Sequence, residues 1–269
     1  MKALLVMLAL ASVAHASPAA DITKSFQAFV DAGGASDPKL ELFIPPQGDS
    51  PEDRYEWPVL PHDRGEAGGY LDHPKVGVKK LVVSKSGASA WLAAVIANKG
   101  KDPLRASAVL VKDKKQWHVV AMHWSRATAP KHPDACKALA FEWRPKASVP
   151  IIARPPVIAV MKALNPSARF TDVMSDDGNA LMFGPADTTV GGAAIKNVFA
   201  TWKVTGPWHE PGKDLSAFAN VTPDGELAWM ALEVGGPSDQ CTDYRTLFVL
   251  ADEADGWKLV HQHYSLPAK

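Results

Sequence analysis

Two pairs of arginine and histidine residues recur at one spacing and carry side chains that could bind or react with a ligand. Arg105 and His123 are 18 positions apart, as are Arg245 and His263. An arginine offers a planar fork of donors to a carboxylate or carbonyl group, and a histidine can orient a ligand or move a proton. The alternative is structural, with each pair bonded to backbone carbonyls or to a carboxylate. We favour the structural interpretation, because the first pair persists although the segment before it has lost its helical pattern.

A metal site is the second chemistry that the residue types suggest. His261 and His263 lie two positions apart, so on a strand both point to one face. Such a pair can hold zinc when a third ligand converges on it. Ala121 occupies the position that corresponds to His261, and no acidic motif stands nearby. We therefore predict neither a bound metal nor a cofactor.

Acid–base catalysis would require a carboxylate held in an apolar pocket. Asp172, Asp176 and Asp177 are the candidates, but Asp176-Asp177-Gly178 is typical of a turn. The nucleophile-elbow, helical zinc, phosphate-loop and dinucleotide-binding motifs are absent from the sequence. The catalytic residues are thus unknown, and an isomerase, cyclase or dehydratase using a His–Asp pair is an alternative function.

The segments that must position these residues occur twice. Residues 105–125 and 245–265 align without a gap and are identical at seven of 21 positions, where unrelated sequences would match at roughly one or two. The identities include Trp117/Trp257 and Ser125/Ser265, and upstream Gly87–Trp91 corresponds to Gly225–Trp229. We interpret this similarity as a duplication.

Each copy is predicted to end in four antiparallel strands, punctuated by turns rich in Gly, Asp and Pro. The second copy begins with helices and a strand, an order typical of an α+β domain, whereas the first lacks a convincing helical front and residues 45–69 resemble a loop. The predicted strands are 76–84, 89–97, 104–112 and 116–124 in the first copy and 179–183, 215–221, 227–234, 243–251 and 257–264 in the second, with helices at 157–164, 191–202 and 134–142.

Several of these strands are apolar on both faces, as residues 117–124 illustrate. An antiparallel sheet with one face in water should alternate apolar and polar residues. We therefore predict that each sheet is covered on one face by its helices and on the other by the second copy, as a pseudo-dimer within one chain. A separate oligomer is then not required.

The C-terminal residues also resemble a known family. The segment Asp255 to Ser265, preceded by Arg245, and the passage Phe183 to Lys196 resemble the SnoaL-like branch of the nuclear transport factor 2-like superfamily. The resemblance implies two tandem cone-like domains, each a curved sheet with helices on one face and a pocket at its open end. Family members include isomerases, cyclases, ligand binders and self-association modules, so the fold does not choose among these functions. The implied pocket residues are Arg245, His263, His261, Trp202 and Phe170, with Arg105 and His123 in the first copy.

The N-terminus has the features of a secretory signal peptide. Lys2 is followed by an apolar run and by the small-residue site Ala14-His15-Ala16. We expect residues 1–16 to be removed and the protein to be periplasmic or extracellular. Cys136 and Cys241 could form a disulfide in that compartment or remain as two separate thiols.

The composition narrows the partners. The sequence has 29 basic and 29 acidic side chains, so it lacks the basic excess of a nucleic-acid binder, and no later stretch could be inserted in a membrane. We predict a degenerate SnoaL-like domain at 17–126, a proline-rich linker at 127–155 and a SnoaL-like domain at 156–269. The leading function is an exported, non-catalytic protein that binds a small apolar or carboxylate ligand in the C-terminal domain, and a self-association module is a further alternative.

Overall fold

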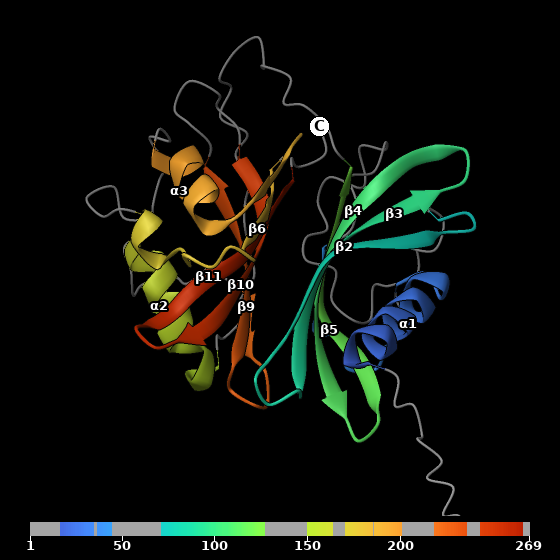
Figure 1. The fold of residues 1–269 in the computed structure, drawn as a ribbon, viewed down its shortest axis with the longest axis horizontal. Coiled ribbons are helices and arrows are strands. Elements are labelled where there is room, and N and C mark those ends of the chain that lie inside the picture. Colours follow the sequence, from blue (N-terminus) through green and yellow to red (C-terminus); the bar gives the residue numbers. More distant parts are fainter. Residues whose placement is uncertain are drawn as a thin grey trace, which may run out of the picture.

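The chain folds into two curved β-sheets and a few helices, which confirms the predicted α+β class (Figure 1). The computed structural model describes residues 17–34, 37–44, 71–126, 150–163, 170–184, 186–200, 218–235 and 243–265. Among these residues, no helix combines the length and the apolar character that a membrane span requires. The predicted helix at 134–142, the loop at 45–69, Trp202 and both cysteines lie outside the described residues.

The N-terminal sheet has the strand order β1-β5-β4-β3-β2. Strand β1 is parallel to β5, and the other neighbours are antiparallel. The four long strands confirm the predicted meander, whereas β1 was not anticipated. The strands are β1 (Leu42–Ile44), β2 (Lys75–Val83), β3 (Ser89–Asn98), β4 (Lys101–Asp113) and β5 (Gln116–Arg126).

The C-terminal sheet has the strand order β7-β6-β11-β10-β9-β8. Strand β6 is parallel to β11, as β1 is to β5. The predicted helices and strands are confirmed to within a few residues, whereas β7 and the 3-10 helices η3 and η4 were not anticipated. The elements of this part are η3 (Ile151–Ala153), α2 (Arg154–Ala163), η4 (Phe170–Val173), β6 (Leu181–Phe183), β7 (Thr188–Val190), α3 (Gly192–Ala200), β8 (Phe218–Val221), β9 (Leu227–Gly235), β10 (Asp243–Glu253) and β11 (Gly256–Ser265).

The prediction that the N-terminal part lacks a helical front was wrong, because α1 (Pro18–Asp31) packs on its sheet. The Ser17 side chain caps this helix by accepting a hydrogen bond from the backbone N–H of Ala20. Proline at the first helical position fixes a helical backbone angle without losing a needed donor. Four apolar residues at helical spacing are buried, namely Ile22, Phe26, Phe29 and Val30.

The buried apolar residues of the described part of the chain form three clusters. One lies between α1 and the N-terminal sheet and another between α2, α3 and the C-terminal sheet. The third contains residues of both sheets and lies where their helix-free faces meet (Figure 1). Trp117 belongs to the α1 cluster, and Trp257 packs against the cluster of α2 and α3. The two tryptophans therefore have comparable surroundings on the helix side of their sheets.

The two sheets also share their pairing register. Arg105 is paired with Ser125, and Arg245 with Ser265. A β-bulge follows Val109 in one sheet and Val249 in the other. Residues 121–123 of β5 pair with β1 as residues 261–263 of β11 pair with β6. Because register decides which face a side chain joins, aligned positions in the two segments point to corresponding faces.

The start of α3 makes a close backbone contact that only glycine allows. A Cβ atom on Gly192 would overlap the Ser175 carbonyl oxygen and the backbone of Asp176, whereas a Cβ atom on Gly178 would meet nothing within 4 Å. We expect Gly192→Ala to lower the free energy of unfolding by about 1–3 kcal/mol, the usual cost of overpacking. Urea denaturation should show this loss, and Gly178→Ala, the matched control, should unfold close to wild type.

Candidate functional site

Most of the residues expected to line a pocket lie instead between the two sheets. Arg105, His123, Arg245, His261 and His263 are all buried, and the three histidines are completely so. The three histidines lie on the helix-free faces of β5 and β11, and each is hydrogen-bonded to a serine of the opposite sheet, namely Ser107 of β4, Ser125 of β5 or Ser265 of β11. We name as the interface network the residues Arg105, Ser107, His123, Ser125, Arg245, His261, His263 and Ser265.

The hydrogen bonds of the interface network run reciprocally between the sheets. His123 Nε2 is 2.8 Å from Ser265 Oγ, and His263 Nε2 is 2.7 Å from Ser125 Oγ. The His123 and His263 rings stack with their centroids 3.9 Å apart. His263 aligns with His123 and Ser265 with Ser125, so each sheet contributes the histidine of one bond and the serine of the other. Such an exchange of roles is typical of an interface with two-fold symmetry.

A second branch of the network has no counterpart. His261 Nδ1 lies 2.7 Å from the Leu181 carbonyl oxygen and His261 Nε2 lies 2.6 Å from Ser107 Oγ, which is also 2.8 Å from His263 Nδ1. Since a carbonyl only accepts, neutral His261 carries its proton on Nδ1 and accepts from the Ser107 hydroxyl. Ser107 then accepts from His263 Nδ1–H, and His263 Nε2 accepts from Ser125. In this chain both ring nitrogens of His261 and of His263 have a partner when the imidazoles are uncharged, whereas His123 Nδ1 has none among the described residues.

The surroundings favour those uncharged imidazoles. Burial lowers the pKa of His261 to about 4, against a weaker opposing effect of the Leu181 carbonyl. Burial also lowers the pKa of His123 and of His263 well below the usual value, and the charges of Arg105 and Arg245 add to the effect. The three imidazoles are completely buried between the sheets, so in this arrangement they face the protein and not a ligand.

Arg105 reaches from the N-terminal sheet into the turn between β6 and β7. Its guanidinium donates to the carbonyl oxygens of Gly184, Asp187 and Arg126. Burial lowers the pKa of Arg105 to about 10, although the Asp187 charge opposes this shift. Bonding to backbone carbonyls is the structural role proposed for this arginine from sequence. It leaves the fork directed at the protein's own backbone.

The carboxylates considered for catalysis do not meet His263, whose hydrogen-bond partners in the described chain are Ser107 and Ser125. Asp176 is exposed and pairs with Lys196 at 2.6 Å. Asp177 Oδ1 accepts from the Asn179 N–H, and its carbonyl accepts from Ala180 and Gly192. These bonds confirm the turn that the sequence indicated.

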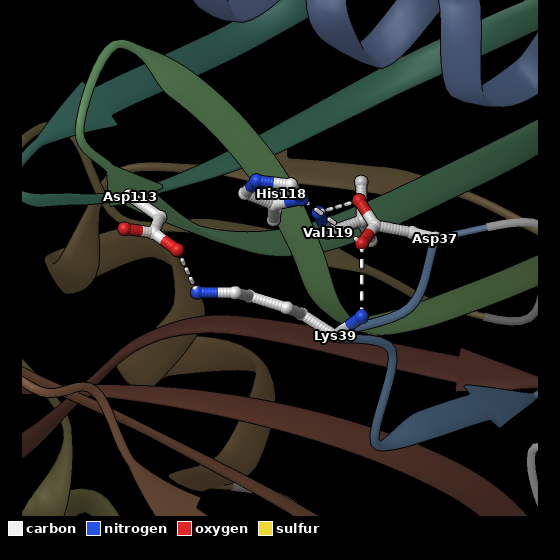
Figure 2. Close-up of polar contacts among 5 residues, drawn as sticks. All are labelled: Asp37, Lys39, Asp113, His118 and Val119. Carbon is white, nitrogen blue, oxygen red and sulfur yellow. Dashed lines mark hydrogen bonds and ion pairs between the residues drawn. The ribbon is translucent and has the colours of Figure 1, made fainter.

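A histidine–aspartate pair does exist at the edge of the N-terminal sheet (Figure 2). His118 Nδ1 is 3.1 Å from Asp37 Oδ1, and Asp37 also accepts from the backbone N–H groups of Lys39 and Val119. The Lys39 ammonium pairs with Asp113. Asp37 thus fastens the segment before β1 to β5, and its oxygens are engaged by backbone donors. We assign this pair a structural role.

A group of polar side chains lies on the opposite face of β10 and β11, toward α2 and α3. Tyr244 and Tyr264 belong to the cluster under these helices. Tyr264 Oη donates to Gln262 Oε1 at 2.8 Å, and Thr246 Oγ1 donates to the Leu232 carbonyl at 2.7 Å. We name Tyr244, Thr246, Gln262 and Tyr264 the helix-side group.

Sequence reasoning missed the helix-side group, although strand alternation could have found it. These four residues lie next to Arg245, Leu247, His261 and His263 in sequence and therefore point to the other face. The aligned residues of the N-terminal sheet are all apolar, namely Leu104, Ala106, Met122 and Trp124. Phe170 belongs to η4 near this region, but its side chain lies outside the described part of the chain.

A carboxylate clasp joins the two sheets at one edge. Asp224 Oδ2 accepts from the hydroxyls of Ser84, Ser86 and Ser89, and Asp224 Oδ1 accepts from Thr222. Partial burial acts to raise the pKa of Asp224, but the four hydroxyls outweigh it and lower the pKa to about 2.

We expect Asp224→Ala to destabilise the protein by about 1–3 kcal/mol, because removing the acceptor leaves several donors without a partner. Thermal unfolding at pH 7 measures the loss, with exposed Asp102→Ala as the control. The Asp224 contribution should be present above pH 3.8 and fade as the pH falls toward 2, since its folded pKa is depressed. Equal melting temperatures for Asp224→Ala and wild type would contradict the clasp's role.

Comparison with known proteins finds a family model that matches the C-terminal part of the chain. Residues 163–269 match the sequence model of the SnoaL-like domain. Similar solved structures include a nuclear transport factor 2-like protein of unknown function from Prochlorococcus (19% identity, 43% of this chain and 96% of that chain, TM-score 0.30) and another from Pseudomonas putida (16% identity, 42% and 82%, TM-score 0.29). A third is a putative calcium/calmodulin-dependent protein kinase II association domain from Xanthomonas campestris (14% identity, 46% and 96%, TM-score 0.30). Among curated proteins, none matches the chain.

Proposed function

We propose that this chain is an exported, non-catalytic binder of a small, largely apolar ligand, built from two SnoaL-like units that pair within one chain. The presence of the helix-side group in the C-terminal unit is the main support for ligand binding. This group places buried hydroxyl and amide groups beneath α2 and α3, whereas the aligned residues of the N-terminal unit are Leu104, Ala106, Met122 and Trp124. The N-terminal unit then acts as the structural partner.

The pairing of the units is supported by three features of the interface. The aligned segments share their register and bulge positions. The bonds His123–Ser265 and His263–Ser125 are reciprocal. Apolar residues of both sheets also form a common cluster. A chain that satisfies its own interface does not require a second copy, so we expect a monomer by light scattering. A stable dimer would favour the self-association function instead.

The ligand class follows from the charge of the helix-side group. Tyr244, Thr246, Gln262 and Tyr264 are uncharged at neutral pH, whereas Arg245 lies on the other face of β10. Ligand pockets are mostly apolar with a few polar groups that fix orientation. We therefore propose a neutral ligand with a carbonyl or hydroxyl group, in place of the carboxylate suggested by Arg245. The enzyme alternative loses support, because His263 bonds serines and not a carboxylate.

Native mass spectrometry of protein recovered from its own periplasm or medium tests this proposal. We expect a retained small molecule and an intact mass that begins at Ser17. Tyr264→Phe and Gln262→Leu should each reduce retention, because they remove hydrogen-bonding groups while keeping side-chain size. Val260→Ala, on the opposite face of β11, should retain the ligand. Equal retention of the ligand by all variants would place the ligand elsewhere. An intact mass that still includes residues 1–16 would contradict export.

A further inference from the structure

The two faces that meet between the sheets differ at two aligned positions that matter for pairing. Ser107 of β4 aligns with Leu247 of β10, and Ala121 of β5 aligns with His261 of β11. All four residues are fully buried. His261 Nε2 is 2.6 Å from Ser107 Oγ, so the large polar residue of one face meets the small polar residue of the other.

The other two residues complement each other in the apolar sense. Ala121 and Leu247 both belong to the cluster between the sheets. The bonds His123–Ser265 and His263–Ser125 are exchanged when the two sheets are exchanged. The same exchange converts the contact of His261 with Ser107 into a contact of Ala121 with Leu247. Each contact therefore combines one large and one small side chain, and one contact is polar while the other is apolar.

We propose that these two contacts form a pairing code that makes the C-terminal face select the N-terminal face and reject a second copy of itself. The inference rests on the proposed pairing of like units within the chain. Two C-terminal faces would place His261 against Leu247 twice, which overfills the contact and leaves His261 Nε2 without a donor. Two N-terminal faces would place Ser107 against Ala121 twice, which leaves voids and unpaired hydroxyls. Specificity built from mismatches in the wrong complex is a general device of protein pairing.

Ser107, Ala121, Leu247 and His261 form the proposed code. Because the residues around position 121 correspond to those around His261, the four residues can be exchanged between the two faces. The His261 ring stacks on Trp91 with centroids 4.9 Å apart, and Nδ1 donates to Leu181 in β6. For position 121, the corresponding residues are Trp229 in the same interface cluster and Leu42, its partner in β1. A histidine at position 121 would thus find equivalent surroundings.

The test compares half-inverted and fully inverted full-length chains. Ser107→Leu with Ala121→His makes both contacts large against large, and Leu247→Ser with His261→Ala makes both small against small. Each half-inverted chain is expected to melt about 10 °C or more below wild type, from two mismatched buried contacts, or to associate. The chain with all four substitutions restores both combinations. It should remain monomeric and melt within about 5 °C of wild type.

A simpler pair of substitutions guards against a four-site variant that fails to fold. Ser107→Leu combined with His261→Ala makes both contacts leucine against alanine, so its melting temperature should lie above that expected from adding its two single substitutions. The proposal is overturned if the double variant is additive, or if the fully inverted chain folds but melts no higher than the half-inverted chains. A wild-type dimer would contradict the pairing within the chain, and a failed ligand search would leave the code untouched.

Discussion

Lowering the pH from 7.5 to 4.5 is expected to destabilise the protein by several kcal/mol. Burial lowers the pKa of His261 to about 4 from 6.5, and one pKa unit corresponds to about 1.4 kcal/mol, so His261 alone contributes about 3 kcal/mol. His123 and His263 shift in the same direction. The unfolded chain binds more protons than the folded chain in this range, and stability therefore falls as the pH falls.

The pH window follows from these values. The histidine contribution is fully present above pH 6.5 and declines as the pH drops toward 4. Protonation would add positive charge beside Arg105 and Arg245, and would reverse a donor in the chain through Ser107. Across the interface, the Asp187 carboxylate is the charge that faces Arg105.

Urea denaturation followed by tryptophan fluorescence, at half-unit steps from pH 8 to 4, measures this dependence. Exposed His73 supplies the control, since His73→Gln should leave the profile unchanged. Hydrogen exchange should show loss of protection in β4, β5, β10 and β11 before α1. A free energy of unfolding that is constant between pH 7 and 5 would contradict uncharged, buried histidines.

The substitution with the largest expected effect is His263→Ala. His263 bonds Ser107 and Ser125, stacks on His123 and contacts the edge of Phe183. Its removal creates a cavity, leaves the buried Ser125 hydroxyl without its acceptor and removes one of the two partners of Ser107, at a combined cost of about 3–5 kcal/mol. For a domain of this size that cost lowers the melting temperature by roughly 6–20 °C.

Differential scanning calorimetry at pH 7.5 checks the His263→Ala prediction, with His73→Ala as the exposed control. Ser125→Ala should cost less, because it removes one hydrogen bond and little volume. Neutral surface substitutions shift the melting temperature by about 2 °C or less. If His263→Ala shifted it by no more than that, the interface network would not stabilise the paired sheets.

The sequence determined the strands and turns. Local signals such as the Asp255-Gly256 turn and the apolar strands that follow it depend on neighbouring residues only, and β2–β5 and β8–β11 lie close to their predicted bounds. The α1 helix was missed although Ser17, Pro18 and the spacing of Ile22, Phe26 and Phe29 are helical signals.

Tertiary structure decided which face each residue serves. Arg245 and His263 were selected because both recur in the two segments, but recurrence does not show to which face of the sheet a side chain points. The pocket was therefore assigned to the face that carries the interface network. Alternation along a strand separates two faces but does not say which one the helices cover. That choice depends on packing of α2, α3 and the second sheet, whose contacts join residues more than a hundred positions apart. The helix-side group became visible only through this packing.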